Sequence, residues 1–139
     1  MEQPASLADE LVSPTLQLLQ ALRAACGGDL ELNIILLAIA ERTIAHPGFR
    51  DMSMDERMQP HEQPFPTRGV NIRSIADSTG IPRETVRRKV ANLERRGWIT
   101  RTPDSLHLTP TAYRALTPAR EELMSLALKF HDLVAQRTK

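Results

Sequence analysis

The strongest constraint on the fold is a pair of short amphipathic helical patterns that meet at one glycine, Gly80. The first pattern covers residues 72–79 and follows Asn71, a residue type that caps helix N-termini well. The second covers about residues 82–96, and its apolar residues recur at the i, i+4, i+7 spacing of one helix face. These inward residues are Val86, Val90 and Leu93. Because a positive φ costs little only for glycine, Gly80 predicts a sharp turn between two packed helices.

Two short β-type runs follow the second helix, at residues 98–102 and 106–109. The residues between them, Pro103-Asp104-Ser105, are typical of a tight turn. Ala76 is small where the two helices would cross, and Ile81 would fill the angle between them. Helix, glycine turn, helix and hairpin in this order is the layout of a winged helix-turn-helix. We therefore expect a mainly α winged helix-turn-helix with a two-stranded wing and flanking N- and C-terminal dimerisation helices.

The N-terminal flank predicts two helices. Ser13 and Pro14 have the residue types of an N-cap and a first helical residue, and Gly27-Gly28 would end that helix. Asp29 is a good N-cap for a second helix that extends to about His46. The middle of the second helix is apolar on every side, which indicates burial in its own domain and against a partner. Ile35 and Leu36 on this helix are therefore assigned to a dimer interface.

The C-terminal flank shows apolar residues at alternating spacings of three and four, the pattern of a helix that packs lengthwise against another. The residues assigned to the dimer interface here are Leu123, Leu126, Phe130 and Leu133. Between the flanks, residues 47–69 hold four prolines and three methionines, and predict a mostly irregular loop with a short helix near residues 54–59 and a short strand entering Val70. We expect a single domain over residues 1–139. Its predicted parts are the N-terminal helices (6–46), the loop (47–69), the helix-turn-helix and wing (70–109) and the C-terminal dimerisation helices (110–139).

The composition is that of an ordinary soluble protein, with 41% hydrophobic and 25% charged residues. A single cysteine, Cys26, allows no internal disulfide, which fits a reducing cytoplasm; we interpret it as a packing residue rather than a redox sensor. The acidic, proline-interrupted N-terminus does not resemble a signal peptide. The longest apolar run, residues 34–40, is too short to span a membrane.

Charge is distributed unevenly along the chain. Residues 68–101 hold nine cations and three acids, an excess of six positive charges, whereas the remaining residues hold nine cations and fourteen acids. Four of the cations, Arg83, Arg87, Arg88 and Lys89, lie in the first two turns of the second helix. A basic segment on an acidic body indicates a polyanionic partner such as double-stranded DNA.

The outward face of the second helix gathers the residues that we expect to contact DNA. A step of 100° per residue turns Glu84, Arg88 and Arg95 away from the core. Because a helix fits the major groove and its N-terminal residues reach base edges, Arg83, Glu84 and Arg88 are the predicted base-reading residues, with Glu84 holding the Arg88 guanidinium in place. The predicted contacts to the DNA backbone are Arg73, Thr85, Arg87, Arg95 and, from the wing, Arg101.

The stretch IADSTGIPRETVRRKVANLERRGWI resembles the recognition unit of the cyclic-AMP-receptor/FNR regulators, whose corresponding helix begins Arg-Glu-Thr-Val-x-Arg. That resemblance implies base reading by Arg83, Glu84 and Arg88, although Pro82 replaces the usual capping serine and no cyclic-nucleotide-binding β-barrel precedes the unit. The flanking helices and the stretch LTPTAYRAL resemble instead the MarR-type layout, in which a winged helix lies between dimerising helices. The resemblance covers residues 68–116 and implies a homodimeric DNA-binding transcriptional regulator, with no effector specified.

Two function classes stay open. One is a sequence-specific dimeric regulator on an inverted-repeat operator; the other is a winged-helix protein-interaction module that docks through residues 47–69. No phosphate-binding glycine loop, nucleophile elbow or HExxH pattern indicates an enzyme, and no cofactor is predicted. The four histidines lie far apart, without metal-ligand spacing. Whether a small-molecule effector binds is left open.

Overall fold

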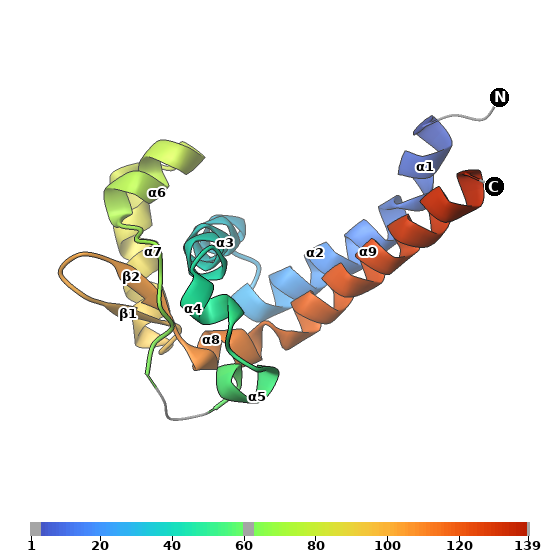
Figure 1. Ribbon diagram of the computed structural model, residues 1–139. Coiled ribbons are helices and arrows are strands. Elements are labelled where there is room, and N and C mark those ends of the chain that lie inside the picture. The colour runs from blue at the N-terminus through green and yellow to red at the C-terminus, as the bar shows by residue number, and fades with distance from the viewer. Residues whose placement is uncertain (1–3, 60–62, 139) are drawn as a thin grey trace. The chain divides into compact units, whose positions relative to one another are not determined.

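The computed structural model describes residues 4–59 and 63–138 (Figure 1). Its contacts divide the chain into two compact units. We call Asp29–Ala115 the winged-helix unit, and Met1–Gly28 together with Leu116–Lys139 the helical unit. Each is described by itself.

The winged-helix unit is mostly helical, with one two-stranded sheet. Its elements are α3 (Leu30–Ile44), α4 (Pro47–Arg50), α5 (Met54–Arg57), α6 (Ile72–Thr79), α7 (Arg83–Arg95), β1 (Ile99–Arg101), β2 (Leu106–Leu108) and α8 (Pro110–Ala115). The two strands are antiparallel, with Ile99 opposite Leu108 and Arg101 opposite Leu106. The prediction of a mainly α winged helix-turn-helix with a two-stranded wing is confirmed.

The core of this unit lies where α3, α6 and α7 meet. The three inward residues predicted for α7, Val86, Val90 and Leu93, are all 0% exposed. Opposite them, α3 and α6 contribute apolar side chains that are also fully buried, namely Leu32, Ile35, Leu36, Ile39 and Ile75. This packing fixes how α7 is rotated about its own axis, and therefore which of its side chains reach solvent.

The turn between α6 and α7 has the predicted left-handed glycine. Gly80 has a φ of 78°, and its N–H donates to the Ala76 carbonyl at 2.9 Å. The Thr79 hydroxyl strengthens the turn, since it donates to the Ile75 carbonyl at 2.7 Å and accepts from the Ile81 N–H at 3.2 Å. Ile81 is then buried at the angle between the two helices.

The connection between α3 and α6 contains more helix than the sequence predicts. The imidazole of His46 accepts from the Gly48 N–H at 2.9 Å and so caps α4, while α3 ends at Ile44, two residues before the predicted end near His46. Ser53 and Glu56 form a capping box at the start of α5, which confirms a short helix in this region. No helix is predicted from the sequence at the start of residues 47–69, but a histidine cap followed by Pro47 starts α4 there.

Arginine side chains attach this connection to α8. Arg57 donates to the Tyr113 hydroxyl at 3.2 Å and to the Phe49 carbonyl at 3.1 Å, and its guanidinium lies 4.0 Å from the centre of the Phe49 ring. Arg114 on α8 donates to the carbonyls of Met58 and Gln59. These bonds hold α4 and α5 on one face of α8.

No strand is assigned at Val70, where the sequence predicts one, but the residues before α6 do bond to the wing. The Phe65 N–H donates to the Leu108 carbonyl at 2.9 Å, and the Leu106 N–H donates to the Val70 carbonyl at 2.9 Å. The segment therefore lies along the free edge of β2 without the continuous ladder of a third strand.

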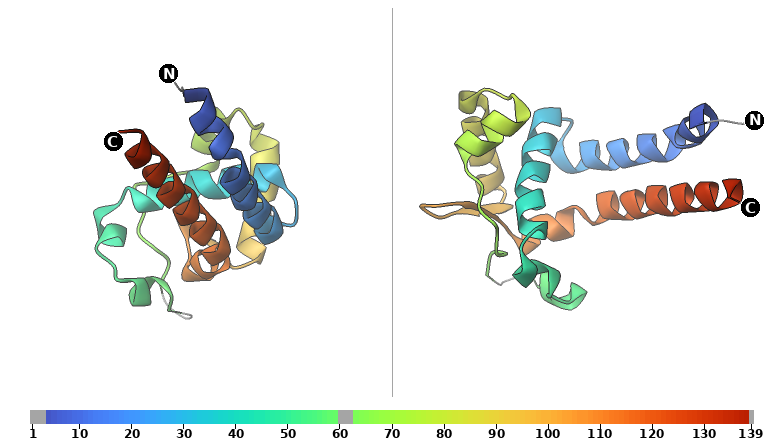
Figure 2. Two further views of the ribbon diagram at one scale, coloured as in Figure 1. Left: turned by 90° about the vertical axis from the view of Figure 1, so that its right-hand side faces the viewer. Right: turned by 45° about the horizontal axis from the view of Figure 1, so that its top comes forward.

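The helical unit consists of α1 (Pro4–Glu10), α2 (Val12–Cys26) and α9 (Thr117–Arg137). In Figure 1 and in both views of Figure 2, α2 and α9 lie side by side and run in opposite directions. Our assignment of Ser13 as an N-cap was wrong. The helix begins at Val12, two residues before the predicted first helical residue, and Pro14 lies in the first turn, where its missing N–H has no helical partner to lose. Within the described part of the chain, no helix combines the length and apolarity that crossing a membrane requires.

Replacing Gly80 tests the turn. An alanine Cβ at this position would meet no heavy atom within 4 Å, so Gly80→Ala costs only the left-handed backbone, about 1–2 kcal/mol. We expect urea unfolding to show this loss. Gly80→Asn is the matched control and should lose less, because asparagine tolerates the left-handed region better than alanine does. Equal stability of Gly80→Ala and wild type would contradict the positive φ in solution.

Candidate nucleic-acid interface

The solvent-facing side of α7 carries most of the predicted DNA-contacting residues. The helix starts directly after Pro82, with no side-chain cap, and its first turn contains Glu84. Five of the predicted residues on this helix, Arg83, Glu84, Arg87, Arg88 and Arg95, are exposed, and Thr85 is half-buried. These residues are exposed because the other face of α7 is packed into the core through Val86, Val90 and Leu93.

Lys89 is one of the four cations at the start of α7, but its side chain bonds within the protein. Its ammonium pairs with the carboxylate of Asp29 at 2.5 Å, and its side chain is only 19% exposed. The same carboxylate caps α3, since it accepts from the Leu32 N–H at 2.9 Å. Asp29 thus joins the start of α3 to the flank of α7, and Lys89 is a positioning residue.

The environment of Asp29 favours its charged form. Burial by itself would raise the pKa of this carboxyl, but the hydrogen bonds from Lys89 and from the Leu32 N–H, together with the positive charges of Lys89 and Arg96, outweigh it. The net effect is a pKa below the ordinary value of 3.8.

Two other cations of the basic segment also bond within the protein. Arg68 donates to the Ala45 carbonyl at 3.2 Å, which joins the residues before α6 to the end of α3. Arg96 donates to the Asn92 side chain at 2.7 Å, and its guanidinium lies 5.2 Å from the centre of the Trp98 ring. With Lys89, they form a set of three cations that support the framework.

Each of the three acids in residues 68–101 pairs with an arginine that the sequence assigns to the DNA backbone. The distances are 4.0 Å for Arg73–Asp77, 3.7 Å for Arg87–Glu84 and 3.1 Å for Arg101–Glu94. The expected ion pair between Glu84 and Arg88 is not the one formed, because Arg87 lies closer at the i, i+3 position. Only the Arg101–Glu94 pair joins two different elements, α7 and β1.

Three arginines remain, and no side-chain hydrogen bond or ion pair engages them anywhere in residues 4–59 and 63–138. They are Arg83, Arg88 and Arg95. Arg88 and Arg95 lie on one stripe of α7 and line a shared hollow of about 300 Å³, together with Asn92 and Asp29. A guanidinium without a protein partner keeps all of its donors for a ligand.

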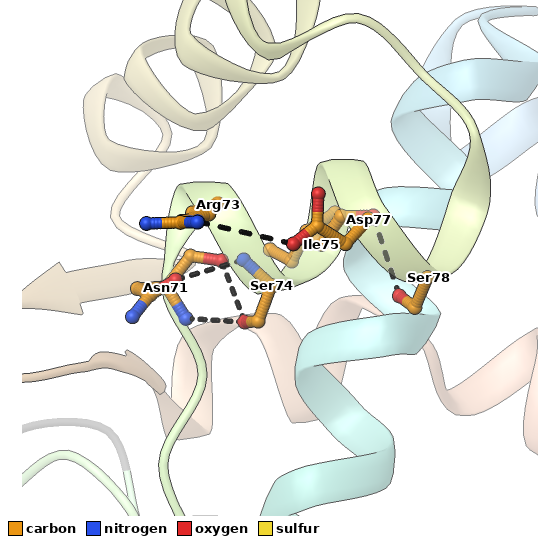
Figure 3. Close-up of polar contacts among 6 residues, drawn as sticks. All are labelled: Asn71, Arg73, Ser74, Ile75, Asp77 and Ser78. Atoms are coloured by element: carbon orange, nitrogen blue, oxygen red, sulfur yellow. Dashed lines mark hydrogen bonds and ion pairs between the residues drawn. The ribbon is translucent and has the colours of Figure 1, made fainter.

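A second hollow, of about 240 Å³, lies between the start of α6 and the wing. It brings together Arg73 and Arg101, which are far apart in sequence. Figure 3 shows how α6 begins: the Asn71 side chain accepts from the Ser74 N–H at 2.8 Å, and the Ser74 hydroxyl accepts from the Asn71 N–H at 2.9 Å. This capping box fixes the first turn of α6, from which Arg73 extends toward Asp77 (Figure 3).

The residues assigned to a dimer interface fall into three groups. Ile35 and Leu36 are 0% and 1% exposed, so they belong to the protomer's own core and offer no surface to a partner. Leu126 and Leu133 are half-buried, whereas Leu123 and Phe130 are exposed. On α3 the exposed apolar residues are instead Leu30, Ile34, Leu37 and Ile44.

Sequence reasoning missed Glu94 and Asp29 as parts of this surface. Asp29 was interpreted only as a cap, and its partner Lys89 lies 60 residues away. Glu94 gives a weak signal, because it lies on the flank of α7 that continues from Arg83 and Arg87 toward the wing. The signal that could have identified Glu94 is an acidic residue near the end of a basic helix, followed by a strand that carries an arginine.

Comparison with known proteins gives one family match. Residues 67–119 match the model of a family described as the sugar-specific transcriptional regulator TrmB. The matched range begins before α6 and includes α7, the wing and α8. The match and the fold together support transcription regulation through DNA binding by a winged helix-turn-helix. The likeness to the cyclic-AMP-receptor/FNR and MarR-type families stays a prediction. No curated protein and no solved structure gave a significant match.

The Asp29–Lys89 pair predicts a pH-dependent contribution to stability. Asp29→Asn keeps an acceptor for the Leu32 N–H but loses the charge that holds Lys89, so we expect a loss of about 1 kcal/mol in the free energy of unfolding near neutral pH. Because the pKa of Asp29 is lowered by folding, this stabilisation is complete above the ordinary value of 3.8 and is lost as the pH falls through the folded value.

Urea unfolding of wild type and Asp29→Asn between about pH 3 and pH 7 should show the two stabilities converging at the acid end. Glu31→Gln is the control, since it removes a carboxylate from the same turn of α3. A difference between wild type and Asp29→Asn that does not change with pH would contradict the assignment.

Proposed function

We propose that the protein is a homodimeric transcriptional regulator that binds an inverted-repeat operator with α7 in the major groove. Arg83, Glu84 and Arg88 read base edges in this proposal. The backbone contacts come from Arg73, Thr85, Arg87, Arg95 and Arg101. The observation that carries it is the exposed face of α7, where Arg83, Arg88 and Arg95 have no partner among the described residues although the surrounding cations do.

The different partners of the arginines support different roles on DNA. A guanidinium with no competing carboxylate can turn two of its donors toward one guanine, which offers O6 and N7 as acceptors. Arg88 meets this condition in the first half of α7, the end that enters a groove. Arg87 is held near Glu84 on the flank, so it favours a contact to the sugar-phosphate backbone.

The helical unit supports self-association. Two helices cannot cover all of their apolar residues by packing on each other, and many stay at least one-third exposed here. On α2 these are Val12, Leu16 and Leu19, and on α9 they are Leu123, Met124, Leu128, Phe130 and Val134. Exposed apolar surface on this scale marks an interaction site, and a second copy would bury it by two-fold symmetry. A two-fold protein in turn requires two-fold half-sites in its operator.

Arg88→Lys tests base reading. Lysine keeps the charge but loses the fork that bonds to two atoms of one guanine. We therefore expect non-specific affinity to change little, while discrimination at one base pair per half-site falls by about 1–3 kcal/mol. The measurement is a selection of bound sequences from a random duplex library, followed by titration of the selected site and its single-base variants.

Arg87→Ala is the matched control, one residue away on the same helix. It should lower the affinity for all duplexes alike and leave the selected motif unchanged. A motif that is unchanged in Arg88→Lys, or changed in Arg87→Ala, would show that α7 lies in the groove with a different rotation.

Sedimentation tests the dimer. At micromolar concentration wild type should sediment as a dimer, and Leu123→Glu should weaken the dimer at least about tenfold, because the new charge would be buried in the interface. Ser125→Glu introduces the same charge on the opposite side of α9 and should remain dimeric. A monomeric wild type would contradict both the dimer and the inverted-repeat operator.

The salt dependence of duplex binding separates this proposal from a winged-helix protein-interaction module. A protein that replaces counterions on several phosphates loses affinity steeply as salt rises. Binding that is absent, or that does not respond to salt, would favour the interaction module.

A further inference from the structure

We infer that Glu94 limits the affinity of the wing for the DNA backbone by holding Arg101 in competition with phosphate. The inference rests on the proposed function, because it assigns Arg101 a phosphate to compete for. Glu94 is not itself a predicted DNA contact. It is a positioning residue that acts through Arg101.

The Arg101–Glu94 pair differs from the other two ion pairs on this surface. At 3.1 Å it is within hydrogen-bond distance, whereas Arg87–Glu84 and Arg73–Asp77 are separated by 3.7 Å and 4.0 Å. Its side chains are also the least exposed, at 42% for Arg101 and 37% for Glu94. In the other two pairs, every side chain is more than half exposed. Lower exposure means weaker screening by water and salt, so this carboxylate competes most effectively with phosphate.

The Arg101 side chain can bond to either the Glu94 carboxylate or a DNA phosphate while its backbone stays fixed. Arg101 is the last ladder residue of β1, opposite Leu106. The turn that follows is closed by reciprocal bonds, since the Thr102 N–H donates to the Ser105 carbonyl at 2.9 Å and the Ser105 N–H donates to the Thr102 hydroxyl at 3.1 Å. The backbone of the wing therefore need not move when Arg101 changes partner.

The position for a competing phosphate is the hollow between the wing and the start of α6. Arg101 and Arg73 both line this hollow, together with Asn71, Ser105 and one acid, Asp104. A phosphate there would meet two arginines, one from the wing and one from α6. Glu94 lies on α7 and does not line the hollow, so a guanidinium that is bonded to its carboxylate keeps fewer donors for a phosphate there.

This exchange has a direct effect on binding. The paired side chains of Arg101 and Glu94 carry no net charge, so in wild type the wing displaces fewer DNA counterions than Arg101 alone would. Removing the carboxylate charge should raise affinity for any duplex, whatever its sequence. The expected gain is the strength of a partly exposed ion pair, roughly two- to fivefold per protomer.

The test compares wild type, Glu94→Gln, Arg101→Ala and the double variant, binding a duplex of arbitrary sequence over a series of salt concentrations. We expect Glu94→Gln to bind roughly two- to fivefold tighter per protomer, with a salt slope steeper by up to about one unit per protomer. In the Arg101→Ala background, the gain from Glu94→Gln should largely disappear, because the carboxylate then has no arginine to hold. Glu31→Gln removes the same charge from the first turn of α3, where it lines no part of this hollow, and its effect should be equal in both backgrounds.

The outcomes distinguish the inference from the function on which it rests. If wild type binds duplex with a steep salt slope but Glu94→Gln binds equally well, the inference is overturned and the proposed function stands. A gain from Glu94→Gln that persists in full without Arg101 also overturns it, since the carboxylate would then act as a general repulsive charge. If neither wild type nor Glu94→Gln binds duplex, the proposed function fails and the inference fails with it.

Discussion

The burial of one face of α7 determines the rest of the candidate interface. Val86, Val90 and Leu93 are fully enclosed, and a rotation of the helix by one residue would bring Arg87 into their place. Burying an unpaired guanidinium costs far more than any packing gain could return, so only one rotation is available. The Asp29–Lys89 pair fixes the same rotation from the flank. The outward direction of Arg88 and Arg95 therefore follows from the core, before any ligand is considered.

The charge of the basic segment is less available than its sequence indicates. Nine cations lie in residues 68–101. Three support the framework, three are paired with the only acids in the segment, and three have no partner among the described residues. The long-range field is unchanged by internal pairing, so attraction to a polyanion at a distance is the same. Close contacts differ, because a paired arginine must give up its carboxylate before it bonds to a phosphate.

Local signals account for what the sequence predicted well. The cap at Asp29, the glycine at Gly80 and the apolar spacing of α7 each depend on residues a few positions apart. The failures depend on longer relations or on unusual caps. No spacing rule links Lys89 to Asp29 or Arg101 to Glu94, and an imidazole cap at His46 is rarer than the Ser, Thr, Asp or Asn caps that sequence reasoning looks for. The assignment of Ile35 and Leu36 to a dimer interface was wrong, because both are buried in the core of their own unit. The middle of α3 is apolar on every side, and periodicity alone does not show which side of such a helix its own unit covers.

The segment between α3 and α6 helps to place the wing. At one end it is tied to α8 by Arg57 and Arg114, and at the other end the Phe65 N–H and the Val70 carbonyl bond to β2. The strands of the wing are only three residues long, too short to hold a fixed orientation by their own ladder. Because β2 leads directly into α8, the segment and the wing are both held by α8 and by the hydrogen bonds at the edge of β2. A change in this segment, even far from α7, would therefore act on the proposed contact of Arg101 with the DNA backbone through the position of the wing.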